Sequence, residues 1–154
     1  MFAAFAAMEV LSYVLHRWLL HGPLWRMHRT HHDPAHGHGH GLEWNDLFSL
    51  AWGALSVGLI WAGREDPLGT AFPLGVGIAV YGVLYFVLHD LYAHGRLDGV
   101  LGRLRFKNGA AQSVKRAHGR HHQSLAKGGQ EPYGLFLFPP WMGRRFVRKR
   151  DRAG

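Results

Sequence analysis

Three apolar stretches alternate with strongly polar segments along the chain. The first covers residues 2 to about 20 and contains Glu9, whereas the second (residues 47–63) and the third (residues 67–88) contain no charged residue. A membrane-spanning helix needs roughly 20 apolar residues, so only the third stretch is long enough to span alone without a charge. Pro73, Gly75 and Gly77 leave two interpretations of it open: one tilted helix or a re-entrant pair.

The turn between the second and third stretches has little positive charge. Residues 64–66 contain one of the 18 lysines and arginines. If the two stretches form a hairpin across a bilayer, the positive-inside rule places both long polar regions on the cytoplasmic side. The pattern predicts an all-α integral membrane protein, a multi-pass transmembrane helical bundle of about three to four spans with a histidine-rich cap at the cytoplasmic face. The alternative is a soluble bundle with buried helices.

Composition narrows the partners and the chemistry. The 154 residues make one domain, with a basic tail from about residue 141 to 154. The absence of cysteine excludes disulfides, iron–sulfur clusters and thiolate catalysis. The net charge of +8 is compatible with nucleic acid, anionic lipid or an acidic protein, but no nucleic-acid motif is present and the basic residues adjoin apolar stretches. We therefore expect membrane lipid and no nucleic acid. Residues 1–15 lack a basic region and a cleavage site, so we expect this segment to be retained.

Histidines are the second unusual feature. Of the 13 in the chain, ten form two copies of one pattern, an HxxxxH pair followed by an HxxHH block. The first copy is His16, His21, His28, His31 and His32, and the second is His89, His94, His118, His121 and His122. All ten lie in or next to the polar regions that the predicted hairpin places on one side of the membrane.

The spacings predict how these rings point. Residues three and four apart share one face of a helix, so each HxxHH block is expected to present three imidazoles to one point. The members of an HxxxxH pair are about 140° apart on an α-helix and cannot share a narrow stripe, unless the helix loosens at its end. Imidazole suits iron, zinc and copper, and ten ligands suit two ions better than one zinc, which needs three or four.

Several sequence motifs resemble the β-carotene 3-hydroxylases of bacteria and plants, within the fatty acid hydroxylase/sterol desaturase superfamily. These motifs are HRWLLHGPLWRMHRTHHDP, NDLF, YGVLYFVLHDLYAHGR, AHGRHH and YGLFLFPP. The resemblance implies that the ten histidines are the metal ligands of a di-iron monooxygenase. It further implies two Fe2+ ions, O2, electrons from an external donor such as ferredoxin, and a lipid-soluble carotenoid substrate whose β-ionone ring is hydroxylated.

Two alternatives stay open at this stage. In the first alternative the chemistry is the same, but the substrate is a fatty-acyl chain or a sterol and the reaction is a hydroxylation or a desaturation. From another class, the chain is a membrane metal-binding or transport protein, for which His36, His38 and His40 are a further signal. The chain also departs from the resembled family at Leu91 and around residues 131–134, which affects the substrate more than the metal ligands.

Ligand histidines usually need an acceptor that fixes the ring orientation. Asp90, Asn45 and Glu9 are the candidates for this role, with Glu43 and Asp46 as further acids that alternatively cap the second helix. Glu9 precedes His16 by two helical turns, so a hydrogen bond between these two side chains is expected. Apart from the metal ligands and these possible acceptors, the sequence indicates no catalytic residue.

Overall fold

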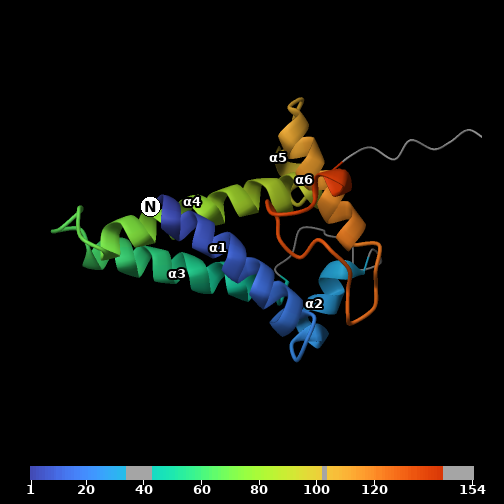
Figure 1. Cartoon of the computed structure of the whole chain (residues 1–154), viewed down its shortest axis with the longest axis horizontal. Coiled ribbons are helices and arrows are strands. Elements are labelled where there is room, and N and C mark those ends of the chain that lie inside the picture. Colours follow the sequence, from blue (N-terminus) through green and yellow to red (C-terminus); the bar gives the residue numbers. More distant parts are fainter. Residues whose placement is uncertain (34–42, 102–103, 144–154) are drawn as a thin grey trace, which may run out of the picture.

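The structure, a computed structural model, describes residues 1–33, 43–101 and 104–143, and all regular elements in these ranges are helices (Figure 1). Two long α-helices continue into π-helices: α1 (Phe2–Val14) into η1 (Leu15–Leu20), and α4 (Ala71–Tyr85) into η3 (Phe86–Ala93). The other elements are α2 (Trp25–His32), α3 (Asp46–Ala62), α5 (Asp98–Leu101), α6 (Gly109–His121) and the 3-10 helix η4 (Pro140–Gly143).

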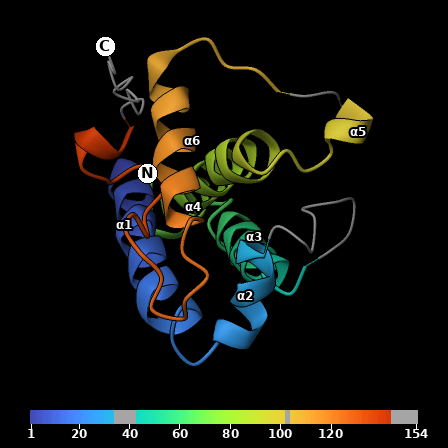
Figure 2. The ribbon, with the colours of Figure 1, turned by 90° about the vertical axis from the view of Figure 1, so that its right-hand side faces the viewer.

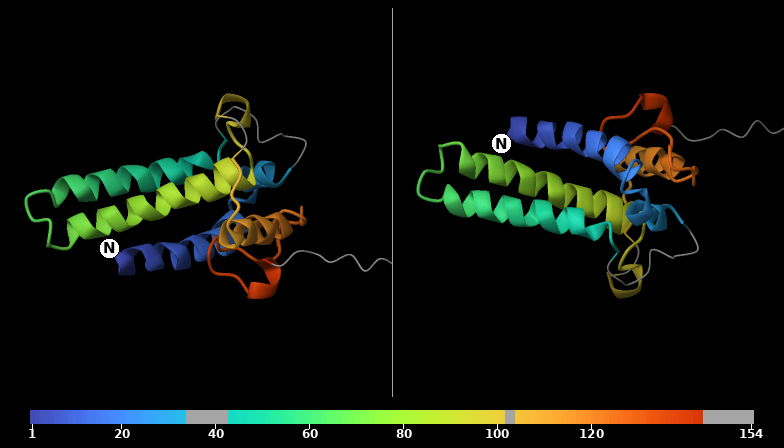
Figure 3. Two further views of the ribbon diagram at one scale, coloured as in Figure 1. Left: turned by 90° about the horizontal axis from the view of Figure 1, so that it is seen from above. Right: turned by 90° about the horizontal axis from the view of Figure 1, so that it is seen from below.

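The second and third apolar stretches form a hairpin of the antiparallel helices α3 and α4 (Figure 3). The two helices approach closely at Gly75, where a Cβ atom would lie 2.8 Å from the backbone nitrogen of Ile60. The Ser56 hydroxyl donates to the Gly75 carbonyl at 3.0 Å. Small residues allow apolar helices to pack in this way. The third stretch is one continuous helical segment through Pro73, not a re-entrant pair.

Helix α1 packs against α4 and has little contact with α3. A Cβ atom on Gly77 of α4 would lie 2.6 Å from the Cβ of Ala4, so glycine is needed for this approach too. Met8, Ile78 and Tyr81 form the buried core of this contact. As a result α4 lies between α1 and α3, as both views in Figure 3 show.

The bundle exposes apolar side chains as a membrane protein does. The segment Ala71–Ala93 has 23 residues and a mean hydropathy of 2.0, which is long and apolar enough to cross a bilayer, and only 22% of its most apolar window is buried. Helix α3 is apolar but shorter. Leu50, Val57 and Val83 are all more than 60% exposed, which would be costly in water and is favourable in lipid.

The shorter helices gather at one end of the bundle. Helices α2, α5 and α6 lie there, and the turn formed by residues 63–70 lies at the other end (Figures 1 and 3). Figure 2 looks along the bundle from this end and shows α6 at the top of the view and α2 at the bottom. Asn108 is the N-cap of helix α6, and its side chain accepts a hydrogen bond from the Ala111 amide at 2.7 Å. All the predicted ligand histidines lie at this end.

Candidate metal centre

The ten histidines form two groups of five, within each of which the candidate ligand atoms all lie within 4.8 Å of one another. The first cluster consists of His16, His21, His28, His32 and His121. The second cluster consists of His31, His89, His94, His118 and His122. Eight of the ten side chains are buried, and His94 and His122 are half-buried.

Each HxxHH block is divided between the two clusters, which corrects the expectation that it points to one centre. In α2, His28 and His32 contribute to the first cluster and His31 to the second. Residues four apart lie on almost the same line of a helix, whereas the third histidine is turned away from them. Helix α6 repeats the arrangement in reverse, because it gives His121 to the first cluster and the other two to the second.

The HxxxxH pairs are brought together by π-helical turns. The His21 amide donates to the His16 carbonyl at 3.0 Å, and the His94 amide donates to the His89 carbonyl at the same distance. This i→i+5 hydrogen bond is the signature of a π-helix, whose wider turn places residues five apart on one face. The 140° separation expected for an α-helix therefore does not apply, and both rings of each pair join one cluster.

In the first cluster every Nδ1 atom faces a neutral oxygen. The rings of His16, His21, His32 and His121 donate to backbone carbonyls in the segment that follows α6, and His28 donates to Asn45 Oδ1 at 2.9 Å. The four carbonyls belong to Tyr133, Lys127, Ser124 and Gln130, respectively. A carbonyl oxygen only accepts hydrogen bonds, so each Nδ1 carries the proton and each Nε2 carries a lone pair.

These Nε2 atoms nevertheless point at one another. The Nε2 atoms of His16 and His28 are 2.9 Å apart, and those of His21 and His121 are 3.2 Å apart. Two lone pairs at this distance repel unless a cation lies between them. A proton is a poor candidate, because burial lowers the pKa of His28 to about 3 and that of His121 to about 4. The donor set therefore fits a metal ion, since neutral imidazole is the form that ligates metals.

The second cluster has the same inward arrangement. The Nε2 atoms of His94 and His118 are 2.8 Å apart, and those of His31 and His89 are 3.3 Å apart. Burial lowers the pKa values of His31 and His118 well below the ordinary value, so these rings too are neutral at neutral pH. Ten inward-facing imidazoles in two equal sets can hold two transition-metal ions.

Among the predicted acceptors, Asn45 and Asp90 lie beside ligand rings. Asn45 holds His28, as described above, and Asp90 Oδ2 is 3.4 Å from His89 Nδ1. Glu43 Oε2 is 3.4 Å from His31 Nδ1. Asp46 does not contact a histidine of either cluster, and instead its two carboxylate oxygens accept from Arg96.

Glu9 contacts different groups from those expected. Its Oε1 atom accepts hydrogen bonds from the backbone amides of Phe136 and Leu137, both at 2.8 Å, and its Oε2 atom accepts from the Tyr81 hydroxyl at 2.9 Å. The expected hydrogen bond to His16 is therefore wrong for the described part of the chain. Glu9 instead fixes the segment whose Tyr133 carbonyl accepts from His16.

The carbonyls of residues 124–133 are the part of the site that sequence reasoning missed. Backbone oxygens have no side-chain signal, so no residue type indicates them. One indirect sign is glycine at position 129, where φ is +58° and a Cβ atom would lie 2.6 Å from the His21 ring. His36, His38 and His40 lie outside the described residues, as does most of the basic tail.

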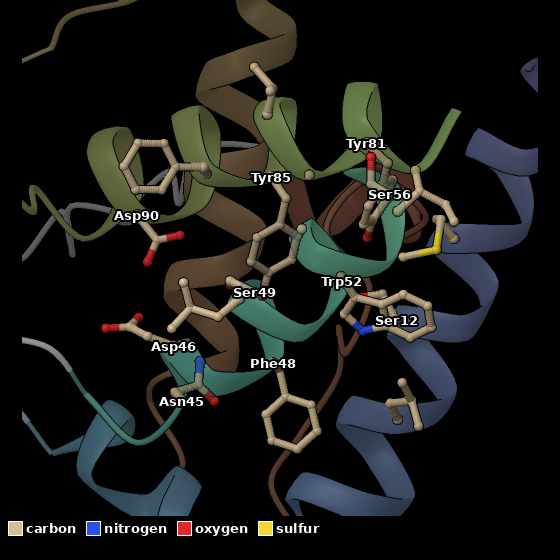
Figure 4. A pocket seen from close by; sticks show the side chains of 18 of the residues that line it. Ser12, Asn45, Asp46, Phe48, Ser49, Trp52, Ser56, Tyr81, Tyr85 and Asp90 are labelled. Carbon is tan, nitrogen blue, oxygen red and sulfur yellow. The ribbon is translucent and has the colours of Figure 1, made fainter. Parts of the chain in front are cut away.

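A cavity of about 620 Å³ adjoins the first cluster and is lined by residues of α1, α3 and α4; in Figure 4, α4 runs across the top, α3 lies in the centre and α1 on the right. His16 and His28 are among its lining residues, and most of the remaining lining is apolar. Tyr85 reaches into it from α4, and its ring stacks on His89 with 4.5 Å between the ring centres. Leu50 and Val83, which are exposed, also line the cavity, so it opens onto the apolar surface of the helices.

Comparisons with known proteins show which family this chain is similar to. The family model of the fatty acid hydroxylases matches residues 1–143. A β-carotene hydroxylase of a Paracoccus species is 35% identical over 144 residues, which are 90% of this chain and 82% of that protein. A β-carotene hydroxylase of Pantoea ananas is 32% identical over 153 residues, 99% of this chain and 83% of that protein.

A plant protein is similar over a smaller share of its own length. The chloroplastic β-carotene 3-hydroxylase 2 of Arabidopsis thaliana is 34% identical over 140 residues, 88% of this chain and 43% of that protein. No solved structure matches the chain.

Proposed function

The chain belongs to the fatty acid hydroxylase family, and we propose that it hydroxylates the β-ionone ring of a carotenoid, converting β-carotene to β-cryptoxanthin and zeaxanthin. The observation that carries this proposal is the mostly apolar cavity that is lined both by exposed apolar residues of the helices and by two histidines of the first cluster. A substrate without polar groups could reach the metal centre through it without leaving the membrane.

The two clusters would each hold one iron ion through five histidines. Bound iron would supply the activation of O2 that an unactivated C–H bond requires. The protein's own groups orient the ligands. The carbonyls of residues 124–133 and the Asn45 side chain keep the first-cluster rings in the tautomer that points Nε2 inward.

The cavity would bind and orient the ring of the substrate. Its volume of about 620 Å³ lies within the usual range for small-molecule sites, roughly 300–1,000 Å³. Apolar side chains from three helices exclude water from the reacting carbon, and Tyr85 lies between the cavity and the His89 ring. The rest of a long carotenoid would extend between α1 and α3 into the lipid.

The placement in the membrane belongs to the same proposal. We place the chain as a multi-pass protein with α1, α3 and α4 as spans and with the histidine end at the cytoplasmic face, where most basic residues of the sequence lie. A soluble, ferredoxin-like electron donor could then dock from the aqueous side. The basic tail after residue 143 would bind anionic lipid headgroups.

The alternatives have less support. A fatty-acyl or sterol substrate would suit the family in general, but the relatives named above are β-carotene hydroxylases. A metal transporter would need ligands along the spans, whereas in the described residues both five-histidine clusters lie at one end of the bundle.

Pigment analysis tests the substrate directly. Expression of the chain in a β-carotene-accumulating bacterium is expected to yield β-cryptoxanthin and zeaxanthin, separated by chromatography. A strain expressing the His121→Ala variant is the control and should retain β-carotene. If the strain with the wild-type chain makes only unaltered β-carotene although the protein is in the membrane with two metal ions bound, the carotenoid assignment fails.

Two glycines of α3 provide a matched test of the cavity. A Cβ atom on Gly53 or on Gly58 would meet nothing within 4 Å, but only Gly53 lines the cavity. Gly53→Phe is expected to lower product formation at least about tenfold, the rate equivalent of about 1.4 kcal/mol, because the ring occupies the substrate's space. Gly58→Phe should behave like wild type. Equal turnover by both variants would remove the cavity from the proposal.

A further inference from the structure

The two clusters differ in the charge of the groups behind their ligands. In the first cluster, all five Nδ1 atoms donate to uncharged oxygens, four from backbone carbonyls and one from the Asn45 amide. A neutral acceptor fixes the orientation of an imidazole ring and adds no net charge near the metal.

Carboxylates lie behind the second cluster. Glu43 Oε2 accepts a hydrogen bond from the Nδ1 atom of His31 at 3.4 Å, whereas Asp90 Oδ2, also 3.4 Å from the Nδ1 atom of His89, acts on that ring through its charge and not through a hydrogen bond. Arg96 pairs with Asp90 at 3.1 Å and with Asp46, so these three side chains together keep one negative charge. A carboxylate behind a ligand histidine makes the ring a stronger donor and attracts the cation directly.

The clusters also differ in their access to the cavity. His16 and His28 of the first cluster line it, and no histidine of the second cluster is among its described lining residues. Tyr85 lies over His89 and separates that ring from the cavity. The first cluster is thus open to small molecules from the cavity, and the second is shielded.

We propose that the two metal sites are inequivalent: the second cluster holds its ion more tightly, and the first cluster, facing the cavity, holds an ion that exchanges more readily. This inference rests on the proposed di-metal function and assigns different tasks to its two sites. The second site retains its ion, and the first is the one that substrate approaches.

Metal removal from the intact protein tests the proposal. The full chain in detergent is loaded with Zn2+ and then exposed to increasing chelator, and the zinc retained per chain is measured by mass spectrometry. We expect two separate steps with a stable form that holds one ion. His121→Ala, which removes a first-cluster ligand, should keep the tightly held ion, and His118→Ala should lose it.

Two charge changes test the cause. Glu43→Gln should weaken the tighter site by about 10- to 100-fold, the usual effect of removing such a partner. Asn45→Asp, which places a carboxylate behind His28, should strengthen the weaker site. Glu65→Gln changes an 82% exposed carboxylate in the turn at the far end of the bundle and should have no effect.

The outcomes separate the two proposals. The inequivalence would be overturned if both ions left the protein in a single step. It would also be overturned if the His118→Ala variant kept the tightly held ion and the His121→Ala variant lost it. An unchanged tighter site in Glu43→Gln would do the same. If hydroxylation persists in these cases, the proposed function stands. A wild-type chain that binds no ion would instead refute the proposed function itself.

Discussion

Glu9, in the first helix, accepts a hydrogen bond from the backbone amide of Leu137 at 2.8 Å, across almost the whole length of the described chain. The same oxygen accepts from the Phe136 amide, and the Gly134 backbone lies so close that a Cβ atom there would be 2.6 Å from it. A charged residue within an apolar helix thus has a structural reason, because it holds the segment that surrounds the first cluster.

We therefore expect Glu9→Ala to destabilise the protein. The change leaves two amides without an acceptor, at a cost of about 1–3 kcal/mol for each one that stays buried. Thermal unfolding in detergent, followed by tryptophan fluorescence, should show a clearly lower midpoint. Glu9→Gln keeps a carbonyl oxygen and should be much closer to wild type. A midpoint for Glu9→Ala equal to that of wild type would contradict this role.

Tyr85 is expected to contribute through its ring. The ring stacks on His89, whereas the hydroxyl has no hydrogen-bond partner among the described residues. Tyr85→Phe should therefore unfold within about 0.5 kcal/mol of wild type. Tyr85→Ala removes a large half-buried ring that packs on His89 and should cost about 2–3 kcal/mol, less than a fully buried ring does. Chemical denaturation of both variants measures the difference, and a similar loss in the two would show that the hydroxyl matters instead.

Neighbouring histidines of α6 should affect different ions. His118 and His121 are one helical turn apart, yet they belong to different clusters. Each alanine variant is expected to lower the metal content from two ions per chain toward one, and the double variant should lose both. Metal analysis of the purified variants checks this. A double variant that retains one full ion would place the two histidines in one site.

Arg96 compensates two acids beside the metal centre. Its side chain is 14% exposed and pairs with Asp46 and Asp90. Arg96→Met is expected to destabilise the protein by about 3 kcal/mol, because it removes the cation that pairs with the buried Asp90 and the half-buried Asp46. Arg64, paired with Glu65 and 47% exposed, is the matched control. Its replacement by Met should cost less than about 1 kcal/mol in the same unfolding experiment.

Much of the architecture follows from local features of the sequence. The apolar runs at residues 2–20, 47–63 and 67–88 correspond to α1–η1, α3 and α4–η3. A helix satisfies its own backbone hydrogen bonds, so a long apolar run can lie in an apolar medium in this form. The repeated histidine pattern is also a local feature of the sequence, and it predicted a metal centre. Imidazole is a common metal ligand, so counting and spacing were sufficient to predict that these ten side chains gather.

Tertiary packing decided which histidine belongs to which site. Helices α2 and α6 each contribute histidines to both clusters, whose rings touch where His32 stacks on His122 at 4.3 Å, and the spacing within HxxHH cannot indicate where the second centre lies. The i→i+5 turns at His21 and His94, the carbonyl acceptors of residues 124–133 and the destination of Glu9 depend likewise on the folded chain. Every residue has a backbone carbonyl, so only the folded structure determines which of them face a ligand ring.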